Sequence, residues 1–152
     1  MNPESGKSDL PISYPPVGSV LSFDFGEKRI GVALGELSIG VAHPLATISE
    51  ESNDKRFAAI AALIKEWQPV MLVVGLPAHM DGTEHDLSAL CRKFARRLEA
   101  RFKIRTALVD ERLTSVEAEQ TLREVGVRGR KQKPMLDQVA AQHILQTFLD
   151  GQ

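Results

Sequence analysis

The sequence predicts an α/β fold in which a mixed five-stranded sheet carries helices on both faces. Three apolar segments follow one another near the start, with too few residues between them for helices. Beyond them the hydrophobic period alternates between that of strands and that of helices. The chain has 152 residues, of which 43% are hydrophobic, so it can form one core and has little room for a second.

Residues 1–17 are polar and rich in proline, and they lack the apolar stretch of a secretory signal. We therefore expect a disordered leader before one domain at residues 18–152. No run of 18 apolar residues predicts a membrane span. The single cysteine, Cys91, rules out an intrachain disulfide and favours a cytoplasmic location. Because the net charge is -1, any basic surface must be local.

The first three strands are expected at residues 20–25, 29–35 and 40–48, as antiparallel neighbours because their connections are short. Residues 54–67 then have helical spacing. The predicted apolar face of this helix consists of Phe57, Ile60, Ala61, Ile64 and Trp67. Residues 70–77 are apolar at successive positions, which indicates a strand buried on both faces.

The second half continues the alternation of helix and strand. Thr83 and Asp86 have the spacing of a capping box. The helix after them has an apolar stripe formed by Leu87, Leu90, Cys91, Phe94 and Leu98. Residues 104–111 predict the fifth strand, and a second capping box at residues 114–117 opens a helix to about residue 125. A glycine-rich basic loop at 126–134 precedes the closing helix at 135–150.

Carboxylates stand at the ends of three predicted core elements. Asp24 lies near the end of the first strand, inside an apolar run, and Glu111, preceded by Asp110, ends the fifth strand. Asp137 lies in the first turn of the last helix, on the same side as the apolar Ala141. With the first strand parallel to the fourth and the fifth beside the fourth, these carboxylates would meet at one edge of the sheet.

Three converging carboxylates repel one another unless a cation is bound. Oxygen ligands favour Mg²⁺ or Mn²⁺, and two such ions about 4 Å apart would serve phosphodiester cleavage. Each residue also has an ordinary structural explanation, which the residues alone leave open. Asp24 can begin a turn, Asp137 can compensate the helix dipole, and Glu111 can pair with Arg112 or Arg29.

Five segments, in order and with matching spacing, resemble the YqgF family of bacterial Holliday-junction-resolvase-like proteins, also described as candidate pre-16S rRNA nucleases. They are DFGEKRIGVALG (24–35), VVGLPAHMDGTE (73–84), KFARRL (93–98), VDERLTSVEA (109–118) and LDQVAAQHILQTFLD (136–150). The resemblance covers the chain from about residue 18. It implies a ribonuclease H-like fold and a metal-dependent nuclease that trims the 5′ end of the small-subunit ribosomal RNA precursor.

The resemblance maps the family's acidic site onto Asp24, Asp137 and the pair Asp110–Glu111. Within the pair we favour Glu111 as the metal ligand, although neighbours on a strand face opposite ways and Asp110 competes. His79 stands where the family usually has asparagine, which affects only the fine contacts of its loop.

Phosphate contacts require Lys, Arg or backbone N–H groups. The residues we expect to bind nucleic acid lie in the basic loop, beside Asp24 and beside Glu111: Lys28, Arg29, Arg112, Arg128, Arg130, Lys131 and Lys133. A second basic cluster is interpreted first as a solvated helix face: Arg92, Lys93, Arg96, Arg97 and Arg101. Aromatic residues make up 5% of the chain and most occupy core-like positions, so they predict no base-stacking platform.

The expected partner is nucleic acid, either precursor ribosomal RNA or branched DNA, with ribosomal particles as a further partner and no membrane. RNA processing ranks first, because a symmetric junction needs two active sites and no apolar seam demands a dimer; we expect a monomer or weak homodimer. Two other classes stay open. Actin-like phosphotransferases also begin with an Asp-x-Gly turn but carry two such domains, and non-catalytic binding modules have lost these carboxylates.

Overall fold

The computed structural model describes residues 17–77, 87–111 and 132–152, with side chains of the last segment from residue 135 onward. The predicted leader, both capping boxes, the helix expected from residue 114 and most of the basic loop lie outside these residues. No helix within the described segments is long and apolar enough to cross a membrane.

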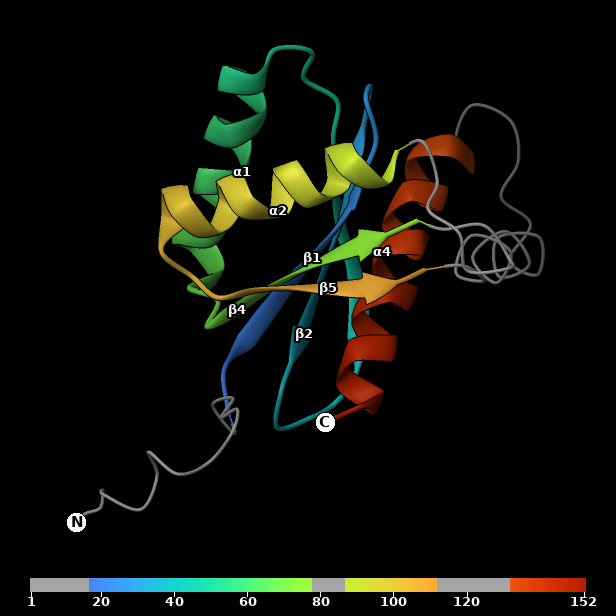
Figure 1. Cartoon of the computed structure of the whole chain (residues 1–152). Helices are drawn as coiled ribbons and strands as arrows, with labels where there is room; N and C mark the ends of the chain where they lie inside the picture. Colours follow the sequence, from blue (N-terminus) through green and yellow to red (C-terminus); the bar gives the residue numbers. More distant parts are fainter. Residues whose placement is uncertain (1–16, 78–86, 112–131) are drawn as a thin grey trace.

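One sheet of five strands forms the centre of the fold (Figure 1). The strands are β1 (Ser19–Phe25), β2 (Ile30–Glu36), β3 (Ala42–Ile48), β4 (Met71–Leu76) and β5 (Thr106–Asp110). Their order is β3-β2-β1-β4-β5. The first three strands are antiparallel neighbours, whereas β1, β4 and β5 run parallel. This topology confirms the mixed sheet and the strand neighbours predicted from the sequence.

Helices cover both faces of the sheet, as predicted (Figure 1). α1 (Asn53–Trp67) and α2 (Ser88–Phe102) lie on one face, and α4 (Gln132–Asp150) lies on the other. Side chains alternate along β1: Leu21 and Phe23 join the core beneath α1 and α2, whereas Val20 joins the core beneath α4. The same alternation directs Asp24 toward α4.

Two predicted helix faces are wrong in detail. Ala61 is exposed, because the buried face of α1 is centred on Arg56, Phe57 and Ile60. Leu90 is 40% exposed. α2 begins at Ser88, whose hydroxyl donates to the Pro77 carbonyl oxygen at 2.5 Å. Leu90 lies at the rim of the core, because the buried face of α2 is centred on Cys91, Phe94 and Leu98. Cys91 is buried as predicted, and burial raises the pKa of its thiol to about 12.

Polar side chains fix α4 against the sheet. The buried Ser22 hydroxyl donates to the Ala141 carbonyl oxygen at 2.7 Å, which ties β1 to the helix. Glutamines one turn apart reach the edge strand β3: the Gln142 side chain donates to the Ala42 carbonyl, and the Gln146 side chain accepts from the Ala42 N–H, both at 3.0 Å. These bonds set the position of α4 and hence of Asp137 on its first turns.

Candidate active site

Asp24 occupies the edge of the sheet where the parallel strands end. It is the second-last residue of β1 and lies opposite Gly31 of β2. The register that pairs Phe23 with Val74 makes Gly75 the next neighbour on β4. Asp24 is therefore flanked by a glycine on each side, so no neighbouring side chain covers it within the sheet.

Gly31 allows α4 to approach the sheet beside Asp24. A Cβ atom at Gly31 would lie 1.9 Å from the carbonyl oxygen of Asp137. No real side chain tolerates that distance, so only glycine permits this contact. Asp137, on the first turns of α4, is thereby held next to Asp24.

Gly75 provides the space for Glu111. A Cβ at Gly75 would lie 1.9 Å from Glu111 Oε2 and 2.4 Å from Ile144 Cδ1 of α4. Glu111 follows the last residue of β5, and its N–H donates to the Leu76 carbonyl oxygen at 3.2 Å. Its carboxylate thus lies over β4, between the sheet and α4, and Oε2 is buried without a hydrogen-bond partner among the described residues.

Burial and like charge disfavour ionisation of both carboxyl groups. Burial, with the charge of Asp137, raises the pKa of Asp24 to about 7. Burial, followed by the charges of Asp24 and Asp110, raises the pKa of Glu111 to about 8. When both groups are ionised, their negative charges repel each other in a poorly solvated place. A bound proton or a bound cation reduces this repulsion.

Asp137 has a cationic partner of its own. Arg29 Nε donates to Asp137 Oδ2 at 2.6 Å, which links the turn after β1 to α4. In the structure, Arg29 therefore balances the charge of Asp137. Within the described segments, no three His, Cys, Asp or Glu side chains are arranged to hold a metal ion as they stand. Glu111 and Asp137 therefore lie near Asp24, but the Asp137 carboxylate forms an ion pair with Arg29.

The other predicted site residues fall into two groups. Asp110 and Lys28 are described, and both are exposed. The remaining candidates for nucleic-acid binding lie outside the described residues or, for Lys133, outside the described side chains: Arg112, Arg128, Arg130, Lys131 and Lys133. His79 also lies outside the described part of the chain.

The sequence reasoning missed the residues that make room for the site. Gly31 and Gly75 stand in strands, where glycine is disfavoured and often marks close approach of another backbone or group. That signal was available in the pattern at both positions. The pairing of Arg29 with Asp137 joins residues 108 apart in the chain, and no local pattern indicates it.

The buried carboxyls predict an unusual pH dependence of stability. In the unfolded chain both groups titrate near pH 4, at about their ordinary pKa. The folded protein holds these protons more tightly, so the stabilisation is complete below about pH 4 and is lost as pH rises through 7 to 8. With divalent cations chelated, we expect Asp24→Asn to become more stable than wild type at pH 8, by ~2 kcal/mol.

Urea denaturation of both proteins at pH 5, 6, 7 and 8 measures this difference. Asp54→Asn is the control, because Asp54 is exposed on α1 and its replacement removes the same charge. The difference between Asp24→Asn and wild type should grow with pH. A difference that stays constant from pH 5 to pH 8 would contradict the account of the buried carboxyls.

Gly75→Ala should disturb the site sterically. The added methyl would meet Glu111 Oε2 at 1.9 Å and the fully buried Ile144 at 2.4 Å. Such overpacking costs about 1–3 kcal/mol in the free energy of unfolding. Gly151→Ala is the control, since the nearest atoms to its Cβ are 3.6 Å away. Equal stability of Gly75→Ala and wild type in urea would show that Glu111 does not occupy this space.

Comparison with known proteins gives matches over most of the chain. The RuvX family, described as Holliday junction resolvase, matches residues 18–151. A protein of Methylobacillus flagellatus named "Putative pre-16S rRNA nuclease" is 69% identical over 134 residues, which cover 88% of this chain and 92% of that protein. A protein of Nitrosomonas europaea with the same name is 62% identical over 133 residues, 88% of this chain and 90% of that protein.

Solved resolvases share the architecture. The Holliday junction resolvase of fowlpox virus aligns with a TM-score of 0.57 at 10% identity, over 88% of this chain and 99% of that chain. RuvC of Thermus thermophilus aligns with a TM-score of 0.53 at 10% identity, over 88% of this chain and 95% of that chain. These likenesses show the ribonuclease H-like fold. Together with the match over residues 18–151, they establish that the chain belongs to the RuvX family of nucleases, which the sequence analysis identified as YqgF.

Proposed function

We propose that this protein is a divalent-metal-dependent nuclease that matures the 5′ end of pre-16S ribosomal RNA, with Asp24 and Glu111 as its central carboxylates. One observation carries the proposal. The Glu111 Oε2 atom is buried without a partner beside Asp24, and burial raises the pKa of both groups. Stability alone does not explain such an arrangement, because a buried carboxyl without a partner destabilises the fold.

The donor set suits a hard divalent cation. Carboxylate oxygens are the ligands that Mg²⁺ and Mn²⁺ prefer, and the orphaned Oε2 provides a free acceptor. Asp24 and Glu111 would hold such an ion, and Asp137 would complete the set once Arg29 moves from Oδ2 to substrate. When bound, one or two ions would supply an activated water and charge stabilisation at the leaving oxygen.

The protein's own residues would prepare this chemistry. Asp24 and Glu111 must lose their protons when the ion binds, so activity should require a pH at which this loss is cheap. Arg29 holds Asp137 in place and neutralises one negative charge where the phosphate backbone must approach. The two flanking glycines leave the room in which Asp137 and Glu111 approach Asp24.

The proposed substrate follows the printed names of the relatives, two of which are named as pre-16S rRNA nucleases. Holliday junction resolution is the second candidate, on the description of the family. If the substrate is pre-16S rRNA, ribosomal particles would be a further partner and the cytoplasm would be the location. RNA ranks first because the printed names of these relatives specify pre-16S rRNA.

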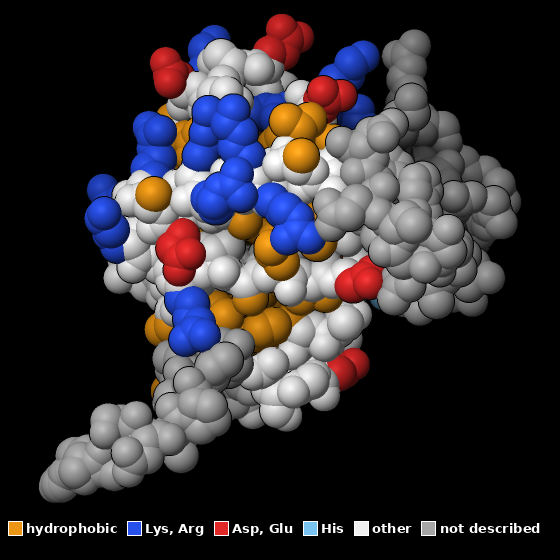
Figure 2. Space-filling model, in the orientation of Figure 1, with side chains coloured by type: hydrophobic (Ala, Val, Ile, Leu, Met, Phe, Trp, Pro, Cys, Tyr) orange, Lys and Arg blue, Asp and Glu red, His pale blue; other side chains and the backbone are white. Residues whose placement is uncertain are grey.

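Basic side chains at the surface would hold the phosphate backbone. Figure 2 shows Lys and Arg side chains gathered over α2 and the adjoining part of α1. Binding by the loop stays a prediction. Arg128, Arg130 and Lys131 lie outside the described part of the chain, and the side chain of Lys133 is not described. Both groups would bind backbone rather than read bases.

Incubation of the purified protein with a precursor RNA fragment and with a four-way DNA junction, side by side, tests the function. Each reaction contains Mg²⁺, Mn²⁺ or EDTA, and the 5′ end of the product is mapped. We expect metal-dependent cleavage of the RNA at the mature 5′ end. Cleavage of the junction alone would replace RNA processing with junction resolution, and cleavage in EDTA would remove the metal from the account.

A further inference from the structure

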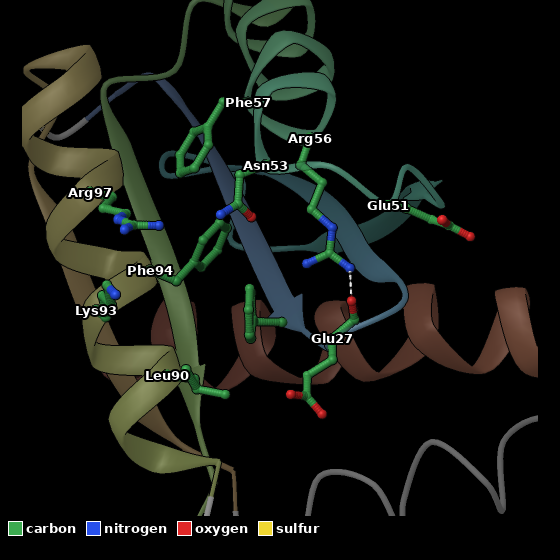
Figure 3. A pocket seen from close by; sticks show the side chains of 10 residues that line it. Glu27, Glu51, Asn53, Arg56, Phe57, Leu90, Lys93, Phe94 and Arg97 are labelled. Carbon is green, nitrogen blue, oxygen red and sulfur yellow. Dashed lines mark hydrogen bonds between the residues drawn. The ribbon is translucent and has the colours of Figure 1, made fainter.

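A second concave site lies next to the carboxylates, on the other face of the sheet. A pocket of about 290 Å³ opens between α1 and α2 and is lined by residues of both helices and of the turn after β1 (Figure 3). Its volume lies near the lower end of the range for small-molecule sites. It therefore has room for one nucleotide and excludes a paired duplex.

The floor and one wall of the pocket are apolar. The rings of Phe25 and Phe94 pack with centroids 4.8 Å apart, and Phe57 lies 6.0 Å from Phe94. Phe25 is half-buried, and Leu90 at the rim is 40% exposed. Phe25 and Leu90 thus offer an apolar surface to a planar group entering from solvent.

A buried arginine fixes the shape of the pocket. Arg56 is 4% exposed, and its guanidinium lies 5.7 Å from the centroid of the Phe25 ring. Its Nε donates to the Glu50 carbonyl oxygen at 2.9 Å, and its Nη2 donates to the Glu27 carbonyl oxygen (Figure 3). The same side chain therefore holds the segment before α1 and the turn after β1, so the pocket is formed before any ligand binds.

The rim has one basic side. Lys93 and Arg97 of α2 line the pocket and are exposed. Within α2, five Lys or Arg residues stand against one acidic residue, Glu99. Glu27 and Glu51 lie on the side away from α2, where they disfavour a phosphate. An apolar wall with a cationic rim on one side matches a nucleobase whose phosphate lies against α2.

The pocket lies within reach of the candidate active site. Phe25 directly follows Asp24 in β1, and their side chains leave the strand toward opposite faces of the sheet. Consecutive Cα atoms are about 3.8 Å apart. A nucleic-acid strand that crosses the end of β1 would therefore meet the carboxylates and the pocket in succession.

We propose that this pocket receives one unpaired nucleotide of the RNA strand, adjacent to the phosphate that is cut, with its base against Phe25 and Leu90 and its phosphate on Lys93 and Arg97. The inference rests on the proposed function and specifies its substrate: a strand that is single-stranded beside the cleavage position. It also disfavours a fully paired four-way junction, because such a junction offers no free base.

The test is an abasic scan. The probe is a fluorescein-labelled RNA hairpin with an unpaired 5′ extension, and each unpaired nucleotide is replaced in turn by an abasic residue. Affinity for the full chain is measured by anisotropy in EDTA, so that no cleavage occurs. Stacking of one base contributes about 1–3 kcal/mol, so one position should lose roughly 5- to 150-fold in affinity and its neighbours far less.

Matched variants connect that position to the pocket. Leu90→Glu should abolish the difference between the abasic and intact probes, whereas Ala89→Glu, an exposed neighbour outside the lining, should retain it. Arg97→Ala should weaken binding several-fold more than Arg96→Ala, which removes the same charge from a residue that does not line the pocket. Equal losses for the two arginine variants, or a positional effect that survives Leu90→Glu, would overturn the proposal.

The two proposals fail separately. If wild-type protein cleaves the precursor RNA and no abasic position matters, the pocket inference falls and the nuclease function stands. If no cleavage occurs with Mg²⁺ or Mn²⁺, yet one abasic position matters and Leu90→Glu erases it, the function falls and the pocket stands as a nucleotide site.

Discussion

Asp24→Asn is expected to abolish RNA cleavage while the fold and the affinity for RNA remain. The asparagine keeps the size of the side chain but removes the charge that would hold the cation. A bound cation supplies several kcal/mol of charge stabilisation, and about 1.4 kcal/mol corresponds to tenfold in rate, so the rate should fall by about 10³-fold or more. Affinity depends on basic residues elsewhere and should change little.

Single-turnover cleavage of the precursor RNA at saturating Mn²⁺ measures this loss. Circular dichroism and urea denaturation of the same preparation show whether the fold is intact. Because Asp24 is buried among like charges, the variant should also be the more stable protein at pH 8 without metal. A cleavage rate close to that of wild type would remove Asp24 from the catalytic site.

Glu111→Gln should reduce turnover by about 10²- to 10³-fold, since loss of one positioned electrostatic group commonly has that effect. Asp110→Asn should leave turnover within about threefold of wild type, as expected for an exposed side chain away from the reacting groups. The two residues are adjacent, but the Glu111 carboxylate lies over Gly75 with Oε2 buried, whereas Asp110 is exposed. The pair therefore serves as its own matched control.

Cleavage kinetics of the two variants at pH 8, with metal in excess, decide the matter. A larger loss in Asp110→Asn than in Glu111→Gln would reverse the assignment. Small and equal losses would mean that neither carboxylate takes part in the reaction.

Much of the fold could be predicted because it depends on local patterns. Short connections require β1, β2 and β3 to be antiparallel neighbours, and the fully apolar run of β4 indicates a central strand. Helical counting from Ala141 placed Asp137 on the core side of α4, and the structure has it there. Each of these conclusions needs only residues that are close in sequence.

What the sequence could not provide depends on packing between distant segments. The alternation of side chains along a strand could not show whether Asp110 or Glu111 faces the candidate site. Glu111 follows the end of β5, and the direction of its side chain depends on the space left by Gly75. The pocket between α1 and α2 was also missed. Its apolar wall combines Phe25 with Leu90, and helical spacing had assigned Leu90 to the apolar face of α2.

The most direct test of the central claim is calorimetric titration of Mn²⁺ into the full chain at pH 7, because burial raises the pKa of Asp24 to about 7 and that of Glu111 to about 8. The account predicts saturable binding with release of protons, seen as a dependence of the heat on the buffer. Binding should be lost in Asp24→Asn and Glu111→Gln and kept in Asp110→Asn. Mn²⁺ binding of equal strength in wild type, Asp24→Asn and Glu111→Gln would contradict the proposal that these carboxylates form the nuclease centre.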